Sequence, residues 1–219
     1  MIELFETCGR GSRARCGGGL MRVAACLIVA LGLLLPATGS AWAGFDDGMT
    51  AAKRGDYRAA YEIWLPLAER GDMRAQYNLG VLYDQGVGVP QNFPEAARWY
   101  LAAAQKGHRD AAANLGYAYE QGRGVAQDFG EAAKWYRRAA ERGDIAAQGN
   151  LGTLYANGLG VEQDDVRAHM WFNLAASQTR GRKARRRLMR KRNSVAARLT
   201  PEQLAEAQRL AQEWQPKAP

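Results

Sequence analysis

The sequence predicts an all-α fold: a right-handed αα superhelix (solenoid) of helix-turn-helix repeats that ends in a C-terminal capping helix. A segment that begins Asn-Leu-Gly recurs with a constant offset of 36 residues, at Asn78, Asn114 and Asn150. A fixed period of this size is typical of repeat architectures. Each copy holds two stretches with apolar residues at helical spacing, and glycines separate the two stretches. The repeat therefore has to be explained before an active site is sought.

The N-terminal part of the chain is expected to be a targeting signal that takes no part in the fold. An apolar run at 23–35 follows Met21, and a small-residue site ends at Ala43. This order is typical of a secretory signal peptide, and the run is shorter than the roughly 20 residues of a membrane-spanning helix. We expect residues 1–20 to be a mis-assigned start and residues 21–43 to be a signal peptide cleaved after Ala43. The mature chain would then be periplasmic or secreted, without a transmembrane span.

Cysteine and histidine usage argues against metal and cofactor chemistry. The three cysteines all precede Ala43, so the mature chain can form neither a disulfide nor a thiolate metal site. His108 and His169 are the two histidines, and neither has an HExxH or CxxC companion. We therefore expect no metal ion and no cofactor.

The mature chain is predicted to begin with a helix pair and to continue as three repeats. Residues 44–71 are expected to form the opening pair, and the repeats to occupy 72–107, 108–143 and 144–179. Each first helix has a glycine near its middle, where glycine costs about 1 kcal/mol against alanine. We expect these glycines to permit the close approach of a neighbouring helix. They are Gly80, Gly116 and Gly152.

Glycines and small polar residues mark the ends of the predicted helices. Each first helix is expected to stop at a left-handed glycine, at Gly86, Gly122 and Gly158. Each second helix is expected to begin after an N-cap, at Asn92, Asp128 and Asp164. In the first two repeats a glutamate three residues later predicts a capping box, and in the third Arg167 takes its place.

One tryptophan per repeat lies in the second helix, and the row extends into the opening pair. Its members are Trp64, Trp99, Trp135 and Trp171. A tryptophan row can stack against a ligand, but at repeat spacing beside alanines it is more typical of the core between repeats. We expect all four side chains to be buried.

Roughly residues 45–214 resemble the Sel-one-like repeat family, a helix-pair relative of the tetratricopeptide repeat, and the full motif is present between Ala75 and Thr179. The matching motif is AxxNLGxxYxxGxGVxxDxxxAxxWYxxAAxxG, which recurs from Ala75, from Ala111 and, in divergent form, from Ala147. Asn92 stands where the motif has aspartate, and Thr179 stands where it has its final glycine. The resemblance implies a helical solenoid, and bacterial members are commonly adaptors in signalling, envelope assembly or surface-polymer regulation.

Positive charge is concentrated after the repeats. Residues 44–179 contain 14 Lys and Arg against 17 Asp and Glu, whereas residues 180–219 contain 12 against 3. The basic segment at 180–199 is either a solvated helix face or an electrostatic docking patch for a polyanion. The basic patch consists of Arg182, Lys183, Arg185, Arg186, Arg187, Arg190, Lys191 and Arg192.

Residues 200–219 are expected to form the capping helix. Thr200 is its predicted N-cap, Pro201 lies in its first turn, and Gln203 completes a capping box. Leu204, Ala207, Ala211 and Trp214 form an apolar face that can cover the end of the stack. A solenoid needs such a cap for solubility.

The first helices carry the predicted binding residues. One amide per repeat is expected either to hydrogen-bond the adjoining loop, the interpretation we favour, or to hold an extended peptide on the concave face. Two matched positions differ between the copies and are therefore candidates for specificity: Val81, Tyr117 and Thr153, and also Tyr77, Ala113 and Gly149. The predicted partner-binding residues are Asn78, Val81, Asn114, Tyr117, Asn150 and Thr153.

No catalytic motif accompanies the repeats. Ser177 and Ser194 lack an SxxK or GxSxG context, and no phosphate-binding GxxxxGK[ST] occurs. We predict a non-enzymatic scaffold or adaptor in the bacterial cell envelope that binds a protein or peptide. The alternative is an electrostatic anchor that binds anionic lipid or polysaccharide through residues 182–192. Export, and the lack of interleaved aromatic residues, argue against nucleic acid.

Overall fold

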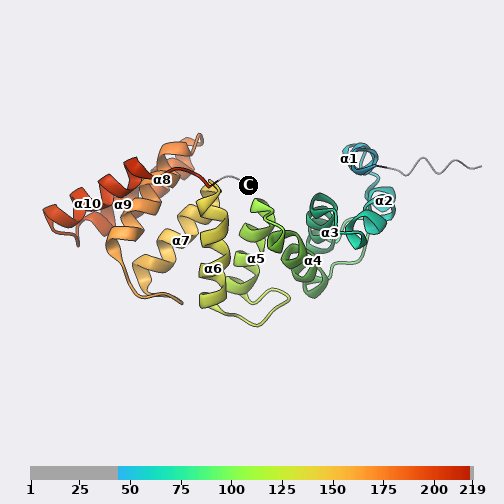
Figure 1. The fold of residues 1–219 in the computed structure, drawn as a ribbon, viewed down its shortest axis with the longest axis horizontal. Helices are drawn as coiled ribbons and strands as arrows, with labels where there is room; N and C mark the ends of the chain where they lie inside the picture. The colour runs from blue at the N-terminus through green and yellow to red at the C-terminus, as the bar shows by residue number, and fades with distance from the viewer. Residues whose placement is uncertain (1–43, 218–219) are drawn as a thin grey trace, which may run out of the picture. The chain divides into compact units, whose positions relative to one another are not determined.

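The computed structural model describes residues 44–217, and within them the chain folds into ten α-helices without a strand (Figure 1). The helices are α1 (Phe45–Lys53), α2 (Tyr57–Glu69), α3 (Met73–Gln85), α4 (Phe93–Gln105), α5 (Arg109–Gln121), α6 (Phe129–Glu141), α7 (Ile145–Asn157), α8 (Asp165–Gln178), α9 (Arg182–Ala196) and α10 (Pro201–Glu213). The predicted signal peptide and its cleavage after Ala43 lie outside the described residues.

Helices that follow one another along the repeats pack side by side (Figure 1). The two helices of each repeat are α3 with α4, α5 with α6, and α7 with α8. Each second helix also packs against the first helix of the next repeat, and α2 packs against α3 in the same way. The fold is a helical repeat solenoid, as predicted, in which each unit buries the apolar face of its neighbour.

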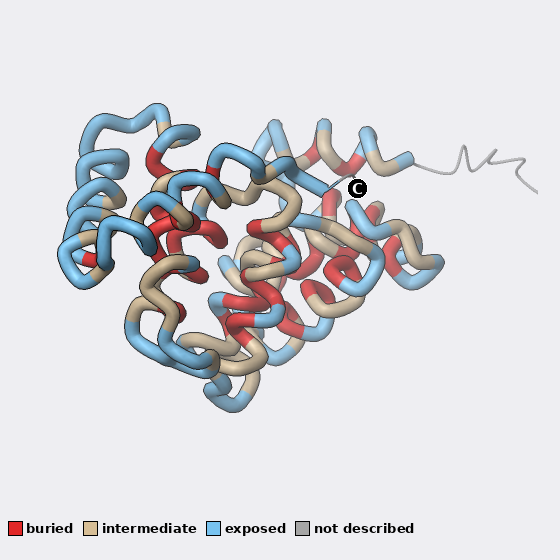
Figure 2. The backbone as a smooth tube through the Cα atoms, turned by 60° about the vertical axis from the view of Figure 1, so that its left-hand side comes forward, coloured by how far each residue is buried: buried red, intermediate tan, exposed pale blue. Residues whose placement is uncertain are grey.

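Buried residues lie where the helices face one another, and exposed residues cover the outer sides (Figure 2). The prediction that the tryptophan row belongs to the core is confirmed. The exposed fractions are 2 % for Trp64, 5 % for Trp99, 7 % for Trp135 and 6 % for Trp171.

The mid-helix glycines admit an aromatic ring from the second helix of the same repeat. A Cβ atom on Gly116 would lie 2.7 Å from Cδ1 of Tyr136, far closer than two carbons approach. Gly80 faces Tyr100 at 2.6 Å in the same way, and Gly152 faces Phe172 at 3.0 Å. The predicted close approach is confirmed, and it explains why each repeat accepts glycine inside a helix.

The predicted ends of the first helices are confirmed, but the predicted capping boxes of the second helices are wrong. Gly86, Gly122 and Gly158 end α3, α5 and α7 with φ values of 69°, 67° and 66°. The N-cap side chain of Asn92 accepts from the backbone N–H of Glu95, as expected. The other half of the box is replaced, because the N–H of Asn92 donates to the carbonyl of Tyr83 at 2.9 Å.

The same replacement recurs along the stack. The N–H of Asp128 donates to the carbonyl of Tyr119, and that of Asp164 to the carbonyl of Tyr155, each at 3.0 Å. Each bond ties the start of a second helix to the last turn of the first helix. The glutamates that were expected to cap are exposed enough to form ion pairs along their own helix. These pairs are Glu95 with Arg98, and Glu131 with Lys134.

The segment after the repeats supplies two helices that both pack against α8. In α10, Ala207 and Ala211 are buried, and Trp214 meets Trp171 edge to face with a centroid distance of 6.3 Å. The predicted capping box of Thr200 and Gln203 is present. None of the helices in residues 44–217 has the length and apolar content that crossing a membrane requires.

Candidate functional site

The six predicted binding residues lie on one side of α3, α5 and α7, which we call the first-helix face. Asn114 and Tyr117 line a cavity of about 240 Å³ where α4 meets α5. We call it the α4–α5 cavity. Asn150 lines a second cavity, of about 330 Å³, between α7 and α9. We call it the α7–α9 cavity. Neither cavity includes Asn78 or Val81.

The α4–α5 cavity combines an ion pair with an exposed aromatic side chain. Arg123 donates to Asp84 at 3.1 Å, and each side chain keeps about a third of its surface exposed. The guanidinium of Arg123 lies 4.3 Å from the ring centroid of Phe93 and 5.7 Å from that of Tyr117. Tyr117 is 44 % exposed, the largest exposed fraction of any aromatic side chain in residues 44–217.

Sequence reasoning missed Asp84, Phe93 and Arg123, although the sequence contained a signal for Arg123. The matched loop position holds Val87 in the first repeat and Leu159 in the third. A charged residue therefore stands once where the other copies have an aliphatic one. The contact with Asp84 spans 39 residues, so only the stacking of two repeats brings the pair together.

The amides of the first helices do not hydrogen-bond the adjoining loops, so the interpretation that we favoured is wrong. The side-chain amide of Asn78 donates to the carbonyl of Arg74 in its own helix, at 2.8 Å. Asn114 is hydrogen-bonded to the hydroxyl of Tyr100, and burial raises the pKa of that phenol. Asn150 bonds Tyr136 in the matched way. The amides of Asn114 and Asn150 therefore link α5 and α7 to the preceding second helix, whereas that of Asn78 stays within α3.

The α7–α9 cavity brings together the two sets of residues that the sequence predicted separately. Asn150 comes from the predicted binding residues, and Arg187 and Lys191 come from the basic patch. The basic segment thus folds back along the third repeat. The remaining lining residues are Ile145, Ala146, Gly149, Thr179, Ala184 and Leu188.

Gly149 allows α9 to approach α7. A Cβ atom at this position would lie 3.1 Å from Cδ2 of Leu188, tighter than an ordinary contact. The matched residues of the other repeats, Tyr77 and Ala113, both carry a side chain. The hydroxyl of Thr153, a predicted binding residue, accepts from the ammonium of Lys191 at 2.9 Å. At the third repeat, α9 therefore covers part of the first-helix face.

The outer side of α9 carries positive charge that no carboxylate of the described residues neutralises. None of the eight basic-patch residues forms an ion pair within residues 44–217. Arg182, Arg186 and Arg190 follow one another at four-residue spacing, where like charges destabilise a helix. The first turn of α9 is basic, although the helix dipole favours acidic residues there.

His108 has a structural role as an N-cap, and His169 is buried in α8. Nδ1 of His108 accepts from the N–H of Ala111 as the N-cap of α5, and its ring stacks on Tyr77 at 4.4 Å. Burial lowers the pKa of His108 and that of the buried His169. No cluster of three or more potential metal ligands occurs within residues 44–217.

Comparison with known proteins agrees with this architecture. The model of the Sel1 repeat matches residues 74–108, 109–144 and 145–179. Its boundaries fall within two residues of those expected from the sequence. Among curated proteins no sequence matches the chain.

Two solved structures are similar. The crystal structure of a Sel1 repeat protein from Oxalobacter formigenes is 35 % identical with a TM-score of 0.58, and the match covers 62 % of this chain and 54 % of that one. The crystal structure of a protective antigen of uropathogenic Escherichia coli strains, which displays an SLR fold, is 32 % identical with a TM-score of 0.53. That match covers 78 % of this chain and 44 % of the antigen.

The chain spans about half the length of these two structures or less. The repeat motif, the stacked helix pairs and the family match coincide over the same residues. Residues 74–179 are therefore three consecutive Sel1 repeats, and the chain belongs to the Sel1 repeat family.

Proposed function

We propose that the chain is a non-enzymatic scaffold in the bacterial cell envelope, periplasmic or secreted, that holds a protein or peptide on its first-helix face. The observation that carries the proposal is the α4–α5 cavity, where Tyr117 and the pair of Asp84 and Arg123 meet at a concave surface. Sel1 repeats are generally protein-interaction scaffolds, which agrees with this use. The leader-like residues 21–43 support the location.

The chemistry of the cavity suits a peptide. Tyrosine and arginine are enriched among the residues that contribute most to binding, because they combine large apolar area with hydrogen-bonding groups. Tyr117 can contact a partner without unfolding any core, since it is already exposed. Asp84 and Arg123 offer one acceptor and several donors to a peptide backbone at the same point.

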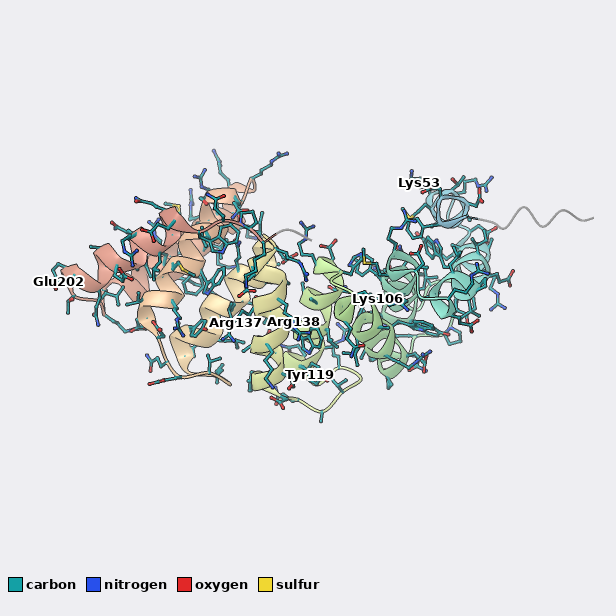
Figure 3. The ribbon with its side chains drawn as sticks, viewed as in Figure 1. Lys53, Lys106, Tyr119, Arg137, Arg138 and Glu202 are labelled. Carbon is teal, nitrogen blue, oxygen red and sulfur yellow. The ribbon has the colours of Figure 1, made fainter. Side chains whose placement is uncertain are left out.

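The test is a selection of displayed random peptides on the full chain, followed by affinity measurement for the selected peptides. We expect Tyr117→Ala and Arg123→Ala to weaken binding at least tenfold, because each removes an anchor from the cavity. Lys53→Ala is the control, because Lys53 lies on α1 (Figure 3) and lines no part of the cavity. Equal affinity for all variants would contradict the proposal.

The charge pattern of α9 favours a second candidate function, an anchor on a polyanionic surface of lipid or polysaccharide. A helix face with three arginines at four-residue spacing and a basic N-terminus is electrostatically unfavourable by itself. An anionic surface would relieve both effects. The repeats would then serve as a spacer that carries the anchor.

Binding to vesicles with and without phosphatidylglycerol tests the anchor at two salt concentrations. Binding to the anionic vesicles should fall steeply between about 50 and 200 mM salt. Replacing the three arginines of the outer face with glutamine should abolish it: Arg182→Gln, Arg186→Gln and Arg190→Gln.

The control for the anchor removes the same charge from side chains that already have a carboxylate partner: Arg58→Gln, Arg98→Gln and Lys134→Gln. This variant should bind the anionic vesicles nearly as well as the wild type. Salt-insensitive binding, or equal loss in both triple variants, would exclude α9 as the anchor.

A further inference from the structure

We propose that the α7–α9 cavity is a subsite for a peptide segment in which an apolar side chain adjoins a carboxylate. The inference rests on the proposed function, because the segment would belong to a partner on the first-helix face. Asn150 in this cavity is the matched residue of Asn114 in the α4–α5 cavity, so each cavity includes a residue of that face. The subsite therefore requires an apolar side chain and a carboxylate at one end of the partner segment.

The lining favours a ligand with an apolar part. Ile145, Ala146, Ala184 and Leu188 provide aliphatic surface, and the cavity volume of about 330 Å³ suits a small ligand or a side chain with its flanking backbone. Gly149 adds no side chain, and Leu188 packs against it to form this part of the cavity wall. A bare inorganic anion would leave this aliphatic surface without a partner.

The charged groups of the cavity are positive only. Arg187 and Lys191 both line it, and no acidic residue does. Lys191 already donates to Thr153, but neither basic side chain forms an ion pair within residues 44–217. Burial and the neighbouring Arg187 lower the pKa of Lys191, and the charge of Glu120, which does not line the cavity, partly opposes this shift. A ligand carboxylate would supply the missing negative charge, and Asn150 can donate a further hydrogen bond.

The two cavities differ in charge, which gives the partner a direction. The α4–α5 cavity contains Asp84 beside Arg123, a balanced pair, whereas the α7–α9 cavity has two cations and no anion. An extended peptide along the first-helix face should therefore place its acidic end at α9. The carboxylate can be an aspartate or glutamate side chain or a chain terminus, since both present the same group.

The test uses N-acetyl-leucine and N-acetyl-leucinamide as probes of the full chain, followed by NMR. The two molecules share the apolar side chain and differ in the carboxylate. N-acetyl-leucine should shift the amide signals of Gly149 and Asn150 saturably. N-acetyl-leucinamide should bind more weakly by a factor of about ten or more, because a charge-assisted hydrogen bond is lost. Inorganic phosphate should not reproduce the pattern of shifts.

Two double variants locate the effect. Arg187→Gln with Lys191→Gln should remove the preference for the carboxylate, because these side chains line the cavity. Arg182→Gln with Arg186→Gln is the matched control, because it removes the same charge from exposed positions of α9 outside the cavity. All four substitutions lie on exposed side chains, so the fold should persist in both variants.

The inference would be overturned by equal binding of acid and amide, by an equal effect of the two double variants, or by no saturable shift at α7 and α9. Phosphate that produced the same shifts would also overturn it, since the site would then be a simple anion site. The probes do not need the α4–α5 cavity, so unchanged peptide affinity in Tyr117→Ala would refute the proposed function separately. Peptide binding without a preference for a carboxylate would refute the inference alone.

Discussion

Gly116→Ala is expected to destabilise the protein, although the same change in an exposed helix stabilises it. Alanine should gain about 1 kcal/mol over glycine in helix propensity. The new Cβ, however, would lie 2.7 Å from Cδ1, 2.9 Å from Cε1 and 3.0 Å from Cγ of Tyr136, whereas carbon atoms normally pack at about 3.5–4.0 Å. Tyr136 is 1 % exposed, and its hydroxyl donates to Glu120 at 2.6 Å, so the ring has little freedom to move.

Overpacking of this kind costs about 1–3 kcal/mol. After the gain in propensity, we expect the free energy of unfolding to fall by about 1 kcal/mol, and at most by about 2 kcal/mol. Urea titration measures this change. In a Tyr136→Ala background the clash is gone, so Gly116→Ala should there stabilise by about 1 kcal/mol. A stabilising effect of Gly116→Ala in the wild type would refute the close-packing argument.

Three further changes test the core, a pH effect and a cap. Trp135→Ala should lower the free energy of unfolding by about 3–5 kcal/mol. An unchanged thermal midpoint would contradict the assignment of Trp135 to the core. Burial lowers the pKa of His108 below the unfolded value of about 6.5, so stability should decrease as the pH falls from about 7 through the folded pKa. His108→Asn keeps an N-cap and should weaken the dependence of the free energy of unfolding on pH, measured by urea titration at several pH values. An unchanged pH dependence would show that another group causes it. Thr200→Ala should cost about 0.5–2 kcal/mol and speed hydrogen exchange in α10, whereas unchanged exchange would show that the cap contributes little.

The repeated part of the fold could be predicted because the same residue type recurs at the same position of each repeat. Gly116 has a glycine 36 residues before and after it, and Trp135 belongs to a row with nearly the same spacing. A residue that recurs at the same position of every repeat has the same surroundings in each of them. Helix ends and the core between repeats follow directly from such positions.

The predictions that failed depend on contacts that a single helix pattern does not contain. The capping box was expected from the glutamate three residues after Asn92, yet the N–H of Asn92 bonds Tyr83, which only the packing of two helices brings near. The same holds for Asn114, whose partner Tyr100 belongs to the preceding repeat. Local rules of capping and turns cannot choose between such partners.

The candidate binding surface stays a prediction, and the structure adds the neighbours that the stacked repeats bring to it. Tyr117 could be identified because its position varies between copies, but Arg123 and Asp84 meet across two repeats. The packing of α9 on α7 could not be predicted, because the basic segment occurs once and no second copy indicates its contacts. Gly149 was noted as a variable position, and the structure shows that it admits Leu188.

The proposed partner lies on the first-helix face at the α4–α5 cavity. Site-specific photo-crosslinking in the source cell tests it most directly, with benzoylphenylalanine in place of Tyr117 or, as a control, in place of Glu202 on α10 (Figure 3). We expect one defined protein adduct from position 117 that is absent at position 202. Arg123→Ala should reduce this adduct. Adducts of equal yield at both positions, or none at position 117, would contradict the proposed function.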